Sequence, residues 1–420
     1  MTKDSWQESR QDSWRARPFY LLITLTLVNA INWADRQVVP ILVPSIKAEL
    51  GLSDTELGVI SGLAFSLIYA VAAFVFGYLA DRNSRKIVIL FGLVSWSLAT
   101  AVSGLATSFW SLFAARFVTG IGEASLYPCA MSLLADAFPA ERRGRAIGLI
   151  GASTALGGGL GIGLGGWLVS VIGWRQVFFL YGACGFLFIP LLLVMIEPKR
   201  SEADLAQLHD PPLSIVTDAL KDVRLLAVWT TGLIMMAGGL GWAAWAPAYF
   251  ERELGFEVER IGALFGVAQL FGGVAGSLIG GRLGDAARKR RFAGQLQVSS
   301  VFALVVAPAV LLTLLDLPHA LLIAAAVIGP FAIFAALPNL QSIVAEIVPQ
   351  RRLGLTFAVH MLFLAGAGAA LGPFLIGAVS DATGSLRTAM LVPVVLMLVS
   401  AVGAWLAGRI VRARTPGAVA

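Results

Sequence analysis

The sequence predicts an all-α membrane protein of twelve transmembrane helices, arranged as two bundles of six. Three observations support this prediction: the composition, the number of long apolar segments, and an internal repeat. Apolar residues make up 58% of the 420 residues and charged residues only 13%, whereas soluble domains average about 25% charged residues. A soluble core cannot bury so much apolar surface, which excludes an ordinary soluble protein.

The apolar segments account for the transmembrane helices. Each crossing needs about 20 mostly apolar residues. Twelve such segments begin near Tyr20, Glu56, Ile87, Phe109, Gly144, Val177, Leu225, Gly262, Ala293, Ala320, Leu353 and Thr388. The first is too long and too polar in its middle for a cleaved signal peptide, so we expect helix one to be retained. Cys129 and Cys184 fall inside predicted spans, and no disulfide, metal site or cofactor is expected.

Lysine and arginine positions predict the topology, because positively charged loops stay on the cytoplasmic side. The N-terminus, the C-terminal tail and every second loop are basic, while the intervening loops hold few basic residues and two of them are acidic. Both termini are therefore expected in the cytoplasm and the chain in the inner (plasma) membrane, where lipid surrounds it. The net charge of +6 is explained by this topology. A nucleic-acid partner is not expected, since short loops offer no clustered basic surface.

The repeat divides the chain into two halves. GYLADRNSRK at 77–86 recurs as GRLGDAARKR at 281–290, and PAERRG at 139–144 recurs as PQRRLG at 349–354. Gly157 and Gly161 correspond to Gly368 and Gly372. The predicted division is a cytoplasmic segment (1–18), an N-terminal six-helix bundle (19–197), a cytoplasmic linker (198–224), a C-terminal six-helix bundle (225–410) and a cytoplasmic tail (411–420). We expect the chain to act as a monomer.

These motifs resemble those of the major facilitator superfamily. GYLADRNSRK is similar to the superfamily motif between helices two and three, and LFAARFVTGIGEA at 112–124 is similar to its helix-four motif. Helix five, from Gly148 through Gly166, resembles the motif associated with antiporters, although Ile162 stands where that motif usually has proline. The resemblance spans nearly the whole chain and implies the major facilitator fold and transport by alternating access.

Within the superfamily, NWADR at 32–36, IKAELGLSD and RFVTGIGEAS look most like a bacterial Spinster-type member. This resemblance implies a transporter, linked to protons or another gradient, for sphingolipid-like or lysolipid-like molecules. It also implies that the acid on helix one and the Arg and Glu on helix four form the coupling and binding centre.

Charged residues inside the spans are the strongest functional signal, because each costs about 2.5 to 3.5 kcal/mol to insert and tends to face a cavity or a partner. Helix one carries Asp35 and Arg36, and helix four carries Arg116 and Glu123, seven residues apart and so on one face. These two acids and two bases sum to zero. They could be a salt-bridge network that locks the two helices together, a functional site, or both.

The functional interpretation assigns a role to each group. Burial favours a protonated carboxyl group and a nearby arginine favours the charged form, so the carboxyl can load and release a proton. Asp35 is the first candidate for proton coupling and Glu123 the second. Arg116 has a planar fork that suits a phosphate or carboxylate, and Arg36 and Asn32 complete the predicted charge network. The expected substrate is a small amphipathic or anionic molecule.

The second half holds no charged residue in its helix interiors, which predicts an apolar cavity face. Taken singly, its polar and aromatic residues are more typical of packing or of hydrogen bonds between helices. Together they permit an apolar cavity wall, for which the candidates are Trp242, Trp245, Tyr249, Gln269, Asn339 and His360.

The cytoplasmic loop motifs predict a gate. Asp81 lies at a helix end where its carboxylate can meet backbone donors or basic residues, and arginines of these loops can reach Asp136. The predicted gate residues are Gly77, Asp81, Arg82, Arg85, Asp136 and Arg145. Anchoring by positive charge alone is the alternative.

Other function classes lack their motifs. An ATP-driven pump needs a phosphate-binding loop such as GxxxxGK[ST], and an enzyme needs a catalytic constellation; the sequence has no such loop, and its three histidines are isolated. The leading hypothesis is a proton-coupled carrier of an amphipathic or lipid-like anion. The alternatives are a proton symporter that imports small organic anions and a multidrug/proton antiporter.

Overall fold

The computed structural model describes residues 3–198 and 212–415, and all of its described elements are helices. Those of the first half are α1 (Lys3–Leu50), α2 (Asp54–Gly58), η1 (Val59–Leu67), α3 (Ile68–Arg82), α4 (Arg85–Ser103), α5 (Phe109–Glu123), α6 (Leu126–Ala137), α7 (Ala140–Phe186) and α8 (Ile189–Val194). Here η denotes a π-helix.

The second half follows the same plan. Its elements are α10 (Pro212–Lys221), α11 (Val223–Arg252), α12 (Val258–Val267), η2 (Ala268–Gly272), α13 (Gly273–Arg290), α14 (Gln295–Thr313), α15 (His319–Ile347), α16 (Gln350–Met361), η3 (Leu362–Gly368), α17 (Ala369–Thr383), α18 (Leu386–Ala389) and α19 (Leu391–Ala413). Part of the predicted linker is thus helical, with Pro212 at the first position of α10, where its missing N–H is tolerated. The predicted boundaries of the two bundles stay a prediction.

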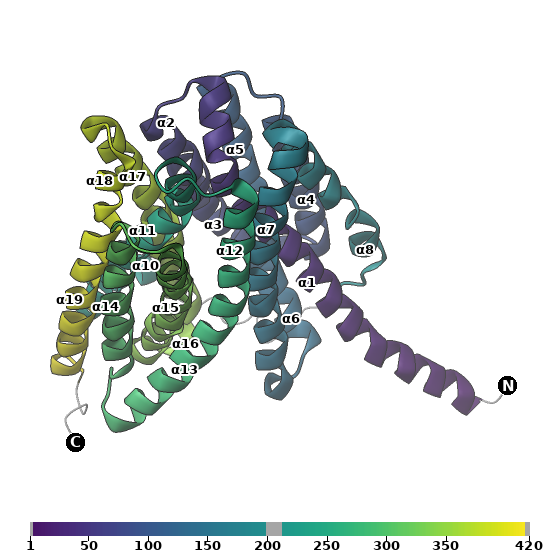
Figure 1. Cartoon of the computed structure of the whole chain (residues 1–420). Helices are drawn as coiled ribbons and strands as arrows, with labels where there is room; N and C mark the ends of the chain where they lie inside the picture. Colours follow the sequence, from purple (N-terminus) through teal and green to yellow (C-terminus); the bar gives the residue numbers. More distant parts are fainter. Residues whose placement is uncertain (1–2, 199–211, 416–420) are drawn as a thin grey trace.

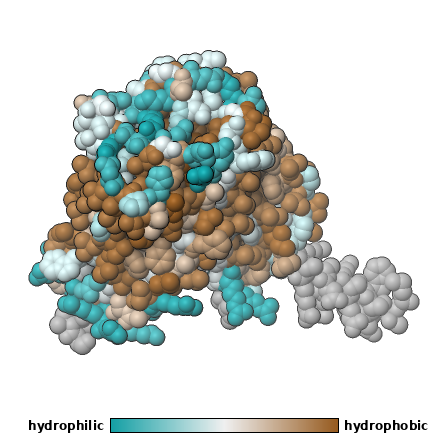
Figure 2. Space-filling view, in the orientation of Figure 1, coloured by the Kyte–Doolittle hydropathy of each residue, from teal (hydrophilic) through white to brown (hydrophobic). Residues whose placement is uncertain are grey.

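Nine helical segments within the described ranges are long and apolar enough to cross a membrane, and three features reconcile them with the predicted twelve. One segment, Arg142–Val194, has 53 residues and contains two predicted spans, which part at Gly173 with φ 77°. The predicted first span lies in α1, which carries polar residues in its middle. The predicted fourth span consists of α5 and α6, which are separated after Glu123. Figure 2 shows hydrophobic residues across the middle of the visible face and hydrophilic ones at both ends.

Close contacts of small residues confirm the repeat in three dimensions. At Gly161 of α7, an added Cβ would come within 2.5 Å of the Ala34 carbonyl oxygen of α1. At the equivalent Gly372 of α17, a Cβ would collide in the same way with the Ala237 carbonyl of α11. Helix α7 therefore packs on α1 as α17 packs on α11, because small residues let helix backbones approach closely.

The two halves meet mainly through α7 on α12 and η2, and through α17 on α2 and η1. The first contact uses a second set of glycines on α7: a Cβ at Gly166 would lie 2.8 Å from the Gly262 Cα. The start of α1 and the end of α19 lie at the end of the molecule opposite α2 (Figure 1).

Candidate functional site

The four charged residues predicted from the sequence, two on α1 and two on α5, come together between these helices. Arg36 donates to Glu123 through Nε at 3.2 Å and Nη2 at 2.9 Å, both to Oε2. Glu123 is fully buried, while the Arg36 side chain keeps 18% of its surface exposed. This ion pair is the predicted lock between helices one and four.

Aromatic rings surround the Arg36 guanidinium. Its Cζ lies 4.6 Å from the Trp33 ring centroid, 4.7 Å from that of Phe65 and 4.5 Å from that of Tyr69. Each such contact is worth about 0.5 to 2 kcal/mol, with the larger values in desolvated sites. Phe65 lies in η1, and π-helical turns are frequent at functional sites. Ring contacts and the Glu123 pair together hold Arg36 in one orientation.

Asp35 points away from that pair. Only 1% of the residue is exposed, and its Oδ2 accepts a hydrogen bond from Thr100 Oγ1 of α4 at 3.1 Å. In the described part of the chain, its Oδ1 has no hydrogen-bond partner. Tyr181 and Cys184 of α7 lie within electrostatic reach of this carboxyl group. Asp35 therefore has an oxygen available to hold a proton.

Arg116 is the least satisfied charge of the cluster. It is 2% exposed, and its Nε and Nη1 have no hydrogen-bond partner among the residues that the structure describes. Asp35 and Glu123 act on it electrostatically, and its Cζ lies 5.2 Å from the Phe65 ring centroid. An unpaired buried guanidinium costs several kcal/mol, so this position calls for an anionic ligand or ordered water. Asn32 Nδ2 of α1 and Glu123 Oε1 also lack partners.

The predicted wall residues of the second half lie mostly inside it. Trp245 Nε1 donates to the Pro373 carbonyl at 2.9 Å, Tyr249 OH donates to the Thr313 carbonyl at 3.1 Å, and Asn339 Nδ2 donates to the Gly280 and Ala335 carbonyls. Trp242 is also buried. These contacts support the packing interpretation for this group.

Gln269 and His360 differ from that group. Gln269 lies in η2 near Gly158 and Gln37, and so it faces the first half. Gln37 is the residue that follows Arg36 in α1. His360 is fully buried, its ring centroid lies 5.4 Å from that of Phe357, and neither ring nitrogen has a partner. Gln269 is therefore a wall candidate that lies against α1 and α7 of the first half.

The predicted cytoplasmic gate contains one dense network, centred on Arg85. Arg85 pairs with Asp136 and donates from Nε to Glu197 Oε1 at 2.9 Å and from Nη1 to Ser132 at 3.0 Å. Burial raises the pKa of Glu197, but hydrogen bonds from Ser84 and Arg85 outweigh it and hold that pKa below its usual range. This network joins elements of the first half only.

The remaining gate candidates are more peripheral. Arg82 Cζ lies 3.8 Å from the Tyr78 ring centroid, Arg145 is exposed, and Gly77 faces Pro128 of α6. The Asp81 side chain lies outside the described part of the structure. Whether these residues gate stays a prediction.

We expect Arg85→Ala to lower the free energy of unfolding by about 3 to 5 kcal/mol, because it leaves the Asp136 carboxylate, whose side chain is 6% exposed, and the partly buried Glu197 without their cation. Since the pKa of Glu197 is depressed in the folded state, its contribution is present above the unfolded pKa of about 4.3 and is lost as the pH falls below it. Denaturant unfolding in detergent at two pH values measures both effects. Arg145→Ala is the control and should change stability by less than about 0.5 kcal/mol; equal effects of the two variants would contradict the assignment.

At the opposite end of the molecule, Asp54 joins the two halves through a cluster of charged and polar residues, here called the outer closure after the predicted topology (Lys47, Asp54, Arg252, Ser380 and Asp381). Asp54 of α2 binds Lys47 at 2.5 Å, Arg252 at 2.9 Å and the Ser380 hydroxyl at 2.6 Å. Asp381 accepts from the backbone N–H groups of Asp54 at 3.0 Å and Thr55 at 2.7 Å. In Figure 1, α2 and α17 meet at this end.

Sequence reasoning missed several of these residues. Thr100 is one of several hydroxyl residues in an apolar span, Glu197 stands after the last apolar run of the first half, and Asp54 is one of several acids in a loop. The Phe65 and Tyr69 rings had a usable signal, because residues four apart lie on one helical face. No sequence signal indicated that these rings would contact Arg36, which lies on another helix.

The fold and the site together define a class. A bundle of two repeated halves with buried charges is the plan of secondary transporters. The family model described as Major Facilitator Superfamily matches residues 25–363. The chain belongs to this superfamily of transporters, as its motifs predicted.

Individual relatives are more distant. The chain is 29% identical over 392 residues to an MFS-type efflux pump of Mycolicibacterium smegmatis, an alignment that covers 91% of each chain. It is 28% identical over 278 residues to a probable L-galactonate transporter of Escherichia coli, which covers 63% of this chain and 61% of the relative.

Among solved structures, a bacterial homolog to the human lysosomal transporter Spinster, in an inward-facing and unoccupied conformation, matches with a TM-score of 0.83 and 24% identity. That match covers 94% of this chain and 97% of the other. The predicted resemblance to Spinster-type transporters is thus confirmed in the fold.

Proposed function

We propose that this transporter works by alternating access and couples protons to the movement of an amphipathic or lipid-like anion. The observation that carries the proposal is the buried Arg116, whose Nε and Nη1 lack partners, within electrostatic reach of Asp35, whose Oδ1 is equally unpartnered. The first is an anion-binding group and the second a proton-binding group.

The separate contacts of the four charged residues support this assignment. Arg36 and Glu123 form an ion pair with each other, which leaves Arg116 to attract an anion and Asp35 to respond to it. A bound anion adds negative charge near Asp35 and so favours its protonation, since a like charge disfavours the ionised carboxyl. Proton and anion are then expected to bind together, and the loaded site carries no extra net charge across the membrane.

The outer closure supports alternating access. Asp54 binds partners from both halves at one end of the molecule, and the superfamily plan moves the halves against each other around a fixed site. We further propose that the chain is a monomer in the inner membrane with both termini in the cytoplasm, as its basic loops indicate, and that the Arg85 network is part of the cytoplasmic gate.

Two alternatives are supported by relatives. The probable L-galactonate transporter favours a proton symporter for small organic anions, for which Arg116 is an equally suitable partner. The efflux pump favours a drug/proton antiporter, and the aromatic rings around Arg36 would suit a lipophilic compound.

Transport by the purified chain in liposomes with an imposed pH gradient separates these options. Three labelled probes are compared: a lysophospholipid with an acidic head group, L-galactonate and the lipophilic cation ethidium. We expect gradient-dependent movement of the lysophospholipid. Movement of only galactonate or only ethidium would favour the corresponding alternative, and indifference of all three probes to the gradient would contradict proton-coupled transport of these classes.

A further inference from the structure

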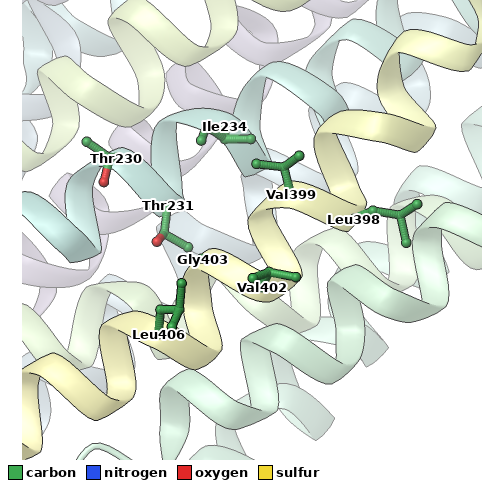
Figure 3. A pocket seen from close by; sticks show the side chains of 8 residues that line it. All are labelled: Thr230, Thr231, Ile234, Leu398, Val399, Val402, Gly403 and Leu406. Carbon is green, nitrogen blue, oxygen red and sulfur yellow. The ribbon is translucent and has the colours of Figure 1, made fainter.

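An apolar groove of about 430 Å³ runs along the outside of the second half, between α11 and α19 (Figure 3). Thr230, Thr231 and Ile234 of α11 form one side, and Val402, Gly403 and Leu406 of α19 belong to the other. Val402 is 57% and Leu406 44% exposed. The groove therefore opens outward, onto the surface that faces lipid.

The chemistry of the walls suits a hydrocarbon chain. The Thr230 and Thr231 hydroxyls each donate at 2.7 Å to a carbonyl of their own helix, those of Leu226 and Ala227, so they seek no partner in the groove. Gly403 creates the space, because a Cβ there would lie 3.0 Å from Thr231 Oγ1.

The groove, together with the arginine beyond its end, spans about one leaflet of a bilayer. Leu398, Val402 and Leu406 follow each other at intervals of four residues, and Arg409 continues the same helical face. From Leu398 to Arg409 the helix rises about 16 Å, which is about half of the 30 Å hydrocarbon thickness. A lipid chain lying along this face would place its head group beside Arg409.

The end of the groove is positively charged. Arg409 is exposed, with its Cζ 4.9 Å from the Trp405 ring centroid. Arg412 lies one turn further; within residues 3–198 and 212–415 its Nη1 has no hydrogen-bond partner, and Arg291 and Arg409 repel it electrostatically. Arg224, nearby on α11, is neutralised by Asp222 at 2.7 Å. The uncompensated charge at this end calls for an anion.

We propose that an anionic phospholipid of the adjoining leaflet binds here, with one acyl chain in the α11–α19 groove and its phosphate on Arg409 and Arg412. Apolar walls, one-leaflet length and clustered arginines all agree with this ligand. The site is separate from the charge cluster at α1 and α5, so the lipid is a bound ligand of the transporter and not its cargo.

Thermal unfolding of the purified full chain, titrated with phosphatidylglycerol or phosphatidylcholine, tests the proposal, because a ligand of the folded state raises the unfolding temperature. Phosphatidylglycerol should stabilise the protein more than phosphatidylcholine does. Arg409→Gln should weaken its apparent affinity about fivefold, the usual share of one basic residue near an anionic surface. Thr230→Trp, at an exposed position, should fill the groove and weaken binding of the same lipid.

Matched controls are available on the same surface. Arg414→Gln removes an exposed charge five residues away, off the groove face, and Val301→Trp adds an indole to the exposed face of α14; both should keep the wild-type affinity. Equal stabilisation by the two lipids, or full retention of affinity in Arg409→Gln, would overturn the proposal. Thermal unfolding does not measure transport, so this test of the lipid site is independent of the proposed substrate.

Discussion

Replacing Asp35 with asparagine is expected to abolish pH-driven accumulation of substrate while leaving the fold intact. A gradient of one pH unit supplies about 1.4 kcal/mol per proton, enough for a tenfold accumulation if one proton moves with one substrate. The asparagine side chain can still accept a hydrogen bond from Thr100, but it cannot take up a proton. The accumulation ratio should therefore fall from about 10 to about 1.

The measurement is uptake into liposomes of whichever probe the wild type accumulates, combined with counterflow exchange. Exchange needs no gradient and should persist in Asp35→Asn. Persistent exchange would show that the variant is folded and active and has lost only its coupling to the proton gradient. Asp316→Asn is the matched control: this carboxylate is 90% exposed at a loop, where it pairs with Arg387, and its loss should leave accumulation unchanged. A tenfold accumulation by Asp35→Asn would place the proton site elsewhere, with Glu123 the next candidate.

Arg116→Ala is expected to weaken binding of the anionic probe by about 100-fold or more without lowering stability. Two charge-assisted hydrogen bonds from Nε and Nη1 would contribute about 1.5 to 3 kcal/mol each, and each 1.4 kcal/mol is tenfold in affinity. In the absence of ligand these donors have no partner, so removing the guanidinium also removes a desolvated charge. The unfolding temperature without ligand should therefore stay constant or rise.

Arg36→Ala gives the contrasting result within the same cluster. It leaves the buried Glu123 unpaired, which typically costs about 3 to 5 kcal/mol, so its unfolding temperature should fall sharply. Equilibrium binding and thermal unfolding of both variants, with Arg116→Lys as the charge-conserving control, separate the two roles. If Arg116→Ala unfolded as easily as Arg36→Ala and still bound the probe normally, Arg116 would be a structural residue.

The sequence predicted most of the fold because the relevant signals are local. Long apolar runs, the alternation of basic loops and the repeated glycines each report on a single helix or on one loop, and the structure follows them. Three spans differed in detail: helices five and six run together as α7, broken at Gly173, and helix four divides after Glu123. Both breaks depend on backbone conformation at single residues, which composition does not specify.

The sequence indicated which charged residues form the candidate cluster, but not which of them pair with each other. Asp35, Arg36, Arg116 and Glu123 are conspicuous because charges are rare at that depth, yet four charges on two helices allow several arrangements. Arg36 forms its ion pair with Glu123 while the rings of Trp33, Phe65 and Tyr69 surround its guanidinium. Two of these rings come from another span. That pairing leaves Arg116 as the anion-binding candidate.

Helix α7 shows how little freedom a transporter helix can have. Gly161 is pressed against α1 and Gly166 against α12, while Leu160, Leu164 and Trp167 turn outward, 45%, 50% and 56% exposed. One face thus packs within the first half, a second packs against the other half, and the third, which faces outward, is the one most open to substitution. Evolutionary drift in this helix should therefore be concentrated on its lipid-facing arc, where any apolar side chain satisfies the membrane.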